Sequence, residues 1–237
     1  MANNKFDFAH FIDHAVLHPT ATEKHLIESC QIAVKYQVTS ICVKPCHVKK
    51  TAELTQISGV PVSTVIGFPH GSNSTDVKVF EAQKAIADGA VELDMVANIG
   101  AVLSGDQTFA GRDIAAVLEV CRAHQVLLKV IFENDFLPDD TYKIELCRIC
   151  SDLQVDFVKT STGFGYTKQA NGFYQYRGAT EHDVALMRQH CPPEIGVKAS
   201  GGIRDLATLK RMVKLGATRI GTSSTAKIAS DFMQIDD

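Results

Sequence analysis

The feature that most constrains this chain is an alternation of short apolar runs with amphipathic helical windows, repeated eight times. Strands are predicted at residues 11–13, 40–43, 60–66, 91–96, 127–132, in the run that ends at Lys159, and at 195–199 and 218–220. Strands that alternate with helices form parallel sheets, and eight such units predict an α/β fold, the closed (β/α)₈ or TIM barrel. An open, doubly wound sheet is the alternative. No linker divides residues 1–237, so we expect a single domain.

Length and charge exclude several classes of protein. The 237 residues suffice for one barrel domain, which typically takes about 250 residues. A formal net charge of −3 without a basic run argues against a nucleic-acid partner. No apolar stretch approaches the roughly 18 residues of a membrane span, and the first eight residues lack an apolar signal core. We therefore expect a cytoplasmic protein that does not bind membranes.

The seven cysteines include one pair, Cys147 and Cys150, with C-x-x-C spacing. Both lie in an apolar helical pattern, and no second pair of cysteine or histidine accompanies them at metal-binding spacing. We interpret them as reduced packing cysteines of a cytosolic protein rather than as a metal or redox site.

Charged residues gather where the predicted strands end. Asp13, Lys44, Asp94, Lys159 and Lys198 hold such positions, and charges are nearly absent inside the strands. Catalytic side chains of a barrel lie at the C-terminal ends of its strands. Each of these residues alone could be a solvated rim residue, and Lys159 alone could extend to the surface. Together they predict a shared site.

Lys159 and Lys198 fall on consecutive predicted strands, which lie roughly 5 Å apart in a sheet. Two ammonium groups in a poorly solvated pocket repel each other, so one lysine should titrate low and supply a free amine. A free amine attacks a carbonyl to form a Schiff base, which favours making or breaking a C–C bond. Asp94 is within the predicted site and could move the protons.

Two glycine–serine loops indicate anion binding. Gly201 and Gly202 follow the seventh predicted strand, and Ser223 and Ser224 follow the eighth. The loops after these two strands commonly hold a phosphate in barrels of this class. The combined interpretation is a lysine-dependent aldolase that acts on a small phosphorylated carbonyl compound.

Four motifs resemble those of the deoxyribose-phosphate aldolase family, over about residues 10 to 226. They are Phe157-Val158-Lys159-Thr160-Ser161-Thr162-Gly163, Val197-Lys198-Ala199-Ser200-Gly201-Gly202-Ile203-Arg204, Glu92-Leu93-Asp94-Met95-Val96 and Ile12-Asp13-His14. The resemblance implies a class I aldolase that reversibly cleaves 2-deoxy-D-ribose 5-phosphate to D-glyceraldehyde 3-phosphate and acetaldehyde, without a metal or other cofactor.

The resemblance also implies roles for single residues. Lys159 would form the Schiff base, Lys198 would perturb its pKa and transfer protons, and Asp94 would be the proton donor or acceptor. Substrate would be bound by Asp13, Cys42, Gly163, Gly201, Gly202, Ser223 and Ser224. The expected partners are a small phosphorylated sugar, its aldehyde products and further copies of the chain in a dimer or tetramer.

The sequence departs from the family pattern at several positions. Ala15 stands where many members have a threonine of the proton relay, Lys44 replaces an asparagine, and His18 replaces a lysine before Pro19. The C-terminal tail, residues 232–237, lacks the tyrosine that assists proton abstraction in many members.

The largest departure is the segment 166–177, where the family usually has few residues. One interpretation is a lid whose Arg177 or Lys168 reaches the phosphate and whose tyrosine replaces the one missing from the tail. The other is an exposed loop used in subunit contact. Two other functions also stay open: a related aldolase with another phosphorylated acceptor, and a sugar-phosphate-binding barrel with little turnover.

Overall fold

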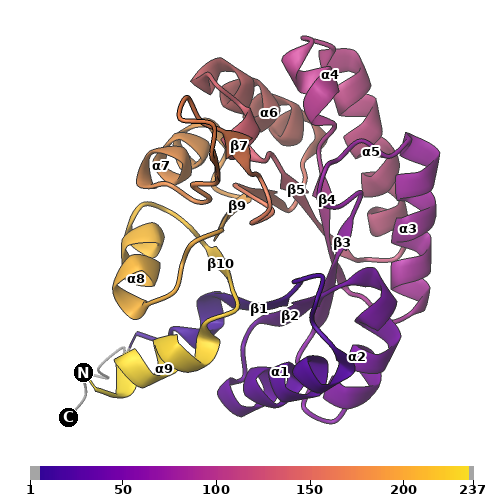
Figure 1. Ribbon diagram of the computed structural model, residues 1–237. Helices are drawn as coiled ribbons and strands as arrows, with labels where there is room; N and C mark the ends of the chain where they lie inside the picture. The colour runs from indigo at the N-terminus through magenta and orange to yellow at the C-terminus, as the bar shows by residue number, and fades with distance from the viewer. Residues whose placement is uncertain (1–5, 235–237) are drawn as a thin grey trace.

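Eight parallel strands of the computed structural model, which describes residues 6–234, close into a barrel (Figure 1). Around the barrel the order is β1-β10-β9-β6-β5-β4-β3-β2. The strands are β1 (Ile12–Val16), β2 (Ser40–Val43), β3 (Val62–Ile66), β4 (Glu92–Val96), β5 (Leu127–Ile131), β6 (Phe157–Lys159), β9 (Gly196–Ser200) and β10 (Arg219–Thr222). The predicted TIM barrel is therefore confirmed, and the open sheet is excluded.

Helices surround the barrel and pack their apolar faces on it. They are α1 (Glu23–Tyr36), α2 (Val48–Thr55), α3 (Thr75–Ala87), α4 (Ile99–Leu103), α5 (Gln107–Ala123), α6 (Asp140–Leu153), α7 (Glu181–His190), α8 (Leu206–Lys214) and α9 (Thr225–Met233). Short 3-10 turns are η1 (Ala9–Phe11), η2 (Pro45–His47) and η3 (Asn134–Phe136). Cys147 and Cys150 are buried in α6 and belong to the hydrophobic core.

Local capping explains several helix boundaries. The hydroxyl of Thr180 accepts from the backbone N–H of Asp183 at the start of α7, and Asp139 caps α6 in the same manner. At α1 the cap is Thr22, which forms a reciprocal capping box with His25, and not Thr20 with Glu23 as the sequence pattern indicated.

Strand β1 differs from its prediction in a way that affects the site. It continues to Val16, because its backbone pairs with β2 as far as Val43, so Asp13 lies inside the strand and not at its end. Asp94 likewise lies in the middle of β4. Helices α4 and α9 were not predicted, and α5 begins at Gln107, before the predicted start at Arg112.

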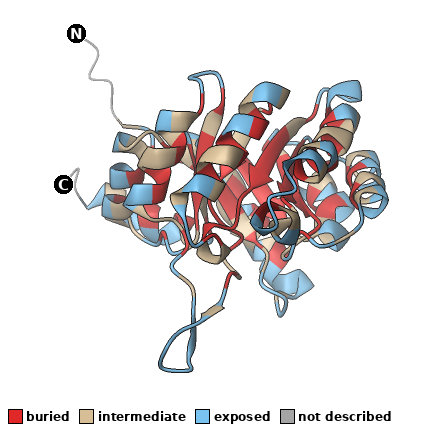
Figure 2. Ribbon diagram, turned by 90° about the horizontal axis from the view of Figure 1, so that it is seen from above, coloured by how far each residue is buried: buried red, intermediate tan, exposed pale blue. Residues whose placement is uncertain are grey.

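The segment 166–177 forms an antiparallel hairpin of β7 (Thr167–Lys168) and β8 (Tyr174–Gln175). In Figure 2 this hairpin projects from one end of the barrel, and most of it is exposed. It follows β6 on the face of the barrel that is turned to the viewer in Figure 1.

Within residues 6–234, no helix combines the length and apolar character needed to cross a membrane. Residues 1–5, which belong to the N-terminal segment expected to lack a signal core, and residues 235–237 of the tail lie outside the described residues.

Candidate active site

Lys159 and Lys198 lie side by side on β6 and β9 and face the same carboxylate. The register of the two strands pairs them directly. The Nζ atoms of both lysines lie 2.7 Å from Oδ2 of Asp94, which is fully buried. The prediction that these three residues converge is therefore correct in geometry.

A second layer of charges surrounds this group inside the barrel. Asp13 contacts Lys198, with Oδ2 2.5 Å from Nζ, and Arg219, with Oδ1 2.5 Å from Nη1. Lys129 Nζ lies 2.8 Å from Asp94 Oδ1 and 2.6 Å from Glu92 Oε2. Acidic and basic residues thus lie within several strands, and the expectation that charges are nearly absent there was wrong.

This network separates the pKa values of the two lysines. Burial lowers the pKa of Lys159, and the charge of Lys198 adds to this while Asp94 opposes it. Burial also acts on Lys198, but its two carboxylate partners, Asp13 and Asp94, outweigh it and raise the pKa of Lys198. Lys159 is therefore the lysine that titrates low.

The charge count supports the same assignment. Among the described residues, this cluster holds three carboxylates (Asp13, Glu92, Asp94) and four basic groups (Lys129, Lys159, Lys198, Arg219). Burial alone would raise the pKa of Asp94, but Lys129, Lys159 and Lys198 hold it well below its ordinary range. The cluster therefore holds one more basic group than acidic groups, and Lys159 is the lysine in it whose pKa is lowered.

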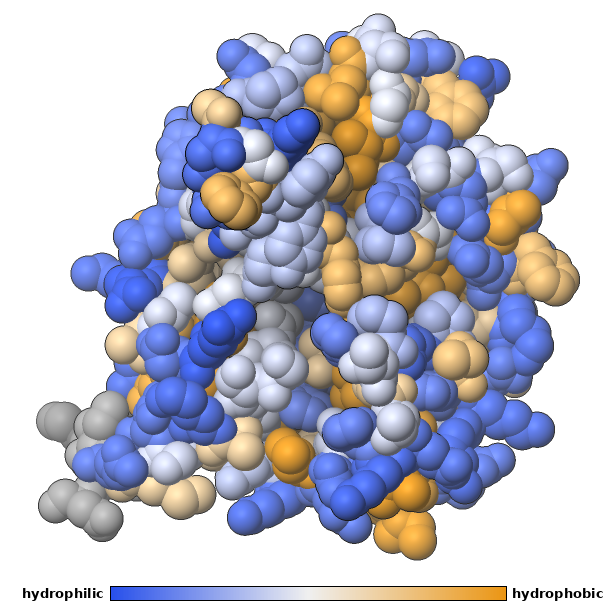
Figure 3. Space-filling model, in the orientation of Figure 1, coloured by the Kyte–Doolittle hydropathy of each residue, from blue (hydrophilic) through white to orange (hydrophobic). Residues whose placement is uncertain are grey.

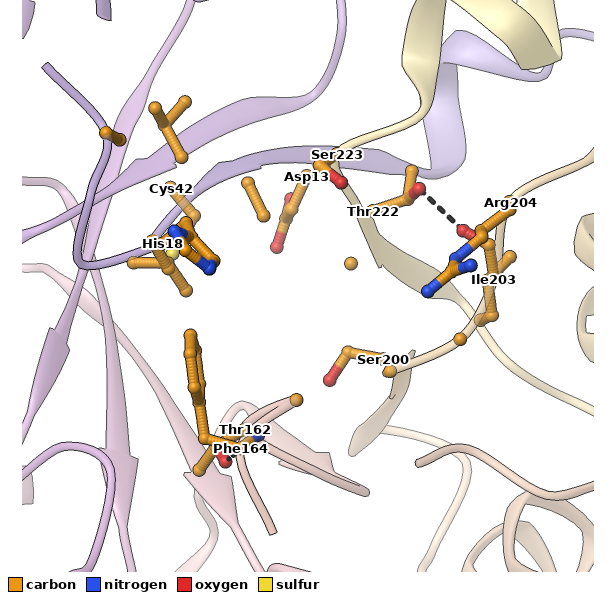
Figure 4. A pocket seen from close by; sticks show the side chains of 18 of the residues that line it. Asp13, His18, Cys42, Thr162, Phe164, Ser200, Ile203, Arg204, Thr222 and Ser223 are labelled. Atoms are coloured by element: carbon orange, nitrogen blue, oxygen red, sulfur yellow. Dashed lines mark hydrogen bonds between the residues drawn. The ribbon is translucent and has the colours of Figure 1, made fainter. Parts of the chain in front are cut away.

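Above the two lysines a cavity of about 810 Å³ opens on the C-terminal face of the barrel, which is the hollowed face in Figure 3. Residues of the β1, β6, β9 and β10 ends line it. In Figure 4, Thr162 and Phe164 lie on one side of this cavity, and Ser200 and Arg204 lie on another. The cavity thus connects a buried amine with a polar rim.

Most of the predicted site residues line this cavity. They are Lys159, Lys198, Asp13, Cys42, Gly163, Gly201, Gly202 and Ser223. Two of the predicted residues do not line it. Asp94 lies beneath the lysines. Ser224 is the N-cap residue of α9, and its backbone N–H donates to the Thr222 hydroxyl at 2.9 Å. Of the two serines predicted to bind an anion, only Ser223 lines the cavity.

Sequence reasoning missed several functional candidates. Arg204, which belongs to the same motif as Lys198, points into the cavity (Figure 4). Lys129 is the one charge in the predicted strand 127–132, and a lysine within a buried strand indicates a polar barrel interior. Arg219 similarly opens the last strand.

The atypical residues near the cavity fall into two groups. Ala15 lines it and offers no hydroxyl, and His18 lines it as well. Lys44 is absent from the lining, because its Nζ donates to the carbonyl of Ala21 at 2.9 Å and so ties down the loop that carries His18. Lys44 therefore shapes the cavity wall and does not add a charge to it.

The hairpin meets the cavity through its tyrosines and not through its cations. Tyr166 and Tyr176 are lining residues. The side chain of Arg177 is 70% exposed and its Nε lies 3.9 Å from Asp135, while Lys168 is exposed on β7. The hypothesis that Arg177 or Lys168 reaches a phosphate finds no support in this geometry.

The sequence and the structure both resemble known aldolases. The model of the DeoC/LacD aldolase family matches residues 8–227. A deoxyribose-phosphate aldolase of Rhodopirellula baltica is 45% identical over 225 residues, which are 95% of this chain and 89% of that protein. An aldolase described as QR15 superposes with a TM-score of 0.88 at 37% identity and 98% coverage of both chains. The tetrameric deoxyribose phosphate aldolase of Aeropyrum pernix gives a TM-score of 0.85 at 32% identity, covering 96% of this chain and 92% of that one.

Proposed function

Because the chain belongs to the DeoC/LacD family of aldolases, we propose that it reversibly cleaves 2-deoxy-D-ribose 5-phosphate to D-glyceraldehyde 3-phosphate and acetaldehyde. The observation that carries this proposal is the lowered pKa of the buried Lys159 beside a lysine whose pKa is raised. A free amine at the base of a cavity is the group needed to attack an aldehyde.

In the first half of the reaction, the neutral amine of Lys159 adds to C1 of the open-chain sugar. The resulting carbinolamine takes up a proton, loses water and becomes a protonated Schiff base. Lys198 is suited to supply and recover these protons, because it is charged and shares Oδ2 of Asp94 with Lys159. Asp94 orients both amines and stabilises the positive charge.

In the second half, the C2–C3 bond breaks. The C3 hydroxyl loses its proton, the C3 fragment leaves as glyceraldehyde 3-phosphate, and the bonding electrons move to C2 to form an enamine on Lys159. A proton added to C2 and hydrolysis of the imine then release acetaldehyde and regenerate the amine. Asp13 lines the cavity beside Lys198, and we assign to it the relay of the hydroxyl proton.

The phosphate is expected at the rim formed by Gly201, Gly202, Ser223 and Arg204. The two glycines have φ values of +93° and +81°, a conformation that only glycine adopts readily and that frees backbone N–H groups for an anion. Arg204 supplies a guanidinium, which binds phosphate oxygens in a fork.

Two broader statements belong to the same proposal. The whole chain acts as one catalytic domain in the cytoplasm, without a metal or other cofactor, and it assembles with copies of itself. The tetrameric relative of Aeropyrum pernix supports assembly as such. A sugar-phosphate-binding role without turnover is disfavoured, because a binder gains nothing from a neutral lysine held at the cost of burying it.

Borohydride trapping tests the central step. Incubation with acetaldehyde and sodium borohydride should add one ethyl group at Lys159, located by peptide mass analysis. The variant K159M should show no adduct, and K168M, on the exposed hairpin, should be labelled as the wild type is. A coupled assay with deoxyribose 5-phosphate should then report glyceraldehyde 3-phosphate. An adduct on another lysine, or none, would refute the proposal.

A further inference from the structure

Two carboxylates after β5 hold the two ends of the segment that carries the hairpin. Glu133, which is fully buried, accepts from the backbone N–H of Thr162 at 3.2 Å and from the Thr162 hydroxyl. Asp135 accepts from the backbone N–H groups of Arg177 at 2.7 Å and Gly178 at 2.9 Å. Because Thr162 precedes the hairpin and Gly178 follows it, Glu133 and Asp135 fasten both of its ends.

Close backbone packing reinforces this attachment. A Cβ on Gly165 would lie 2.9 Å from the carboxyl carbon of Glu133. A Cβ on Gly178 would lie 2.6 Å from the carbonyl oxygen of Gly201, and the N–H of Ala179 donates to that same oxygen at 3.1 Å. The C-terminal end of the hairpin is therefore joined to the loop after β9 that contains Gly201 and Gly202 (the Gly201 loop), which lines the cavity.

Tyr166 and Tyr176 lie just inside the two fastened ends. Their ring centroids are 5.0 Å apart at an interplanar angle of 61°, an edge-to-face contact, and both line the cavity. Phe173 and Tyr174, nearer the tip, are 70% and 64% exposed. The aromatic pair thus forms part of the cavity wall, and the tip of the hairpin does not.

We propose that Tyr166 and Tyr176 select the acceptor aldehyde, and that Glu133 and Asp135 are positioning residues that hold the two rings at the cavity mouth. This inference rests on the proposed function and extends it to the choice of substrate.

The position of the rings assigns them to the acceptor half of the substrate. The two-carbon donor is attached to Lys159, which is 3% exposed at the base of the cavity. The phosphorylated three-carbon half extends towards Arg204 and the Gly201 loop, which touches the backbone of Gly178 two residues after Tyr176. Rings at that point contact the acceptor, limit its size and exclude water from it.

Steady-state kinetics in the synthetic direction test the role of the rings. In Y166A and Y176A we expect the KM for D-glyceraldehyde 3-phosphate to rise about tenfold. This is the change in affinity that corresponds to the loss of a contact worth roughly 1.4 kcal/mol. The KM for acetaldehyde and the rate of borohydride trapping should stay unchanged. The control variants F173A and Y174A, from the same hairpin, should keep the wild-type acceptor KM.

The positioning residues can be tested by a contrast between two amide substitutions. Asp135 accepts two backbone N–H groups on its two oxygens, so in D135N one of them would face an NH₂ group, and the acceptor KM should rise. Glu133 faces one N–H and one hydroxyl, and a hydroxyl can accept as well as donate. E133Q should therefore retain the wild-type KM, while E133A should raise it.

An unchanged acceptor KM in both tyrosine variants would overturn the inference. So would an equal rise in the acetaldehyde KM, or a loss of trapping, because either would assign the rings to the donor half. Failure of the proposed function would look different: the wild-type protein itself would then show no adduct at Lys159.

Discussion

Lys159 and Lys198 share one oxygen of Asp94, each at 2.7 Å, yet the pKa of the first is lowered and that of the second is raised. The difference comes from a second carboxylate, Asp13, which lies 2.5 Å from Lys198 and forms no ion pair with Lys159 within the described part of the chain. The network therefore determines which of the two amines has the lowered pKa.

Removing the charge of Lys198 should raise the pKa of Lys159. In K198M the repulsion disappears while Asp94 remains, so a higher pH is needed to obtain the neutral amine. The pH at which Lys159 reacts half-maximally with an amine-reactive reagent should therefore move upward. Peptide mass analysis measures the extent of this reaction at each pH. K168M serves as the control, and a downward shift would contradict the coupling.

Lys129 should be essential for stability, although it lies away from the cavity. It is fully buried and pairs with Glu92, Asp94 and, at 3.7 Å, Asp13, so K129M would leave three buried carboxylates short of a partner. We expect a loss of about 3–5 kcal/mol in the free energy of unfolding in urea, the usual effect of breaking a buried ion pair. K168M should change it by less than about 0.5 kcal/mol. If K129M also lowered the free energy of unfolding by less than about 0.5 kcal/mol, Lys129 would not be essential for stability.

Two buried groups give opposite dependences of stability on pH. Burial raises the pKa of Glu133 from 4.5 to about 7, so the folded state holds its proton longer and stability falls as the pH rises through this range. Burial lowers the pKa of His14 from 6.5 to about 4, so stability is lost as the pH falls through that range. The two effects offset each other between about pH 4.5 and 6.5.

Replacing Glu133 should expose the contribution of His14. In E133Q the unfolding free energy should increase between pH 4.5 and 6.5 by up to about 3 kcal/mol relative to the wild-type profile, at 1.36 kcal/mol for each pKa unit. Urea unfolding at a series of pH values measures this difference. Parallel profiles of the two proteins would show that Glu133 is ionised at its ordinary pKa.

The contact between Gly178 and Gly201 gives a matched pair of glycine substitutions. Gly172, at the hairpin tip, and Gly178 both have positive φ, +83° and +68°, so alanine costs about 1–2 kcal/mol of backbone strain at either. Only at Gly178 would the new Cβ also meet a backbone, 2.6 Å from Gly201 O. G178A should therefore raise the KM for deoxyribose 5-phosphate, and G172A should not. Equal KM values would show that this contact does not shape the cavity.

The barrel and the two lysines could be predicted because both depend on local patterns. Strands buried on both faces are predominantly apolar, and parallel strands bring the residues at equivalent positions together. Lys159 and Lys198 are such a pair, and the register confirms it. Membership of one family, supported by the motifs around these lysines, followed from the same stretches.

The charged interior could not be predicted from strands taken one at a time. Lys129 is tolerable in β5 only because Glu92 and Asp94 reach it from β4, and Arg219 needs Asp13 from a strand about 200 residues away in sequence. The hairpin posed a similar difficulty, since Asp135 and Arg177 belong to different loops. The contacts that decide these features are distant in sequence, so composition and periodicity do not reveal them.

The balance of three acids and four bases inside the barrel has a consequence for protein engineering. A designer who grafts only Lys159 and Lys198 onto another barrel would transfer the two amines without the counter-charges that divide the proton between them. The portable unit is the whole ionic cluster, including Glu92, Lys129 and Arg219. Laboratory evolution of this scaffold should accordingly exchange its interior charges in compensating pairs.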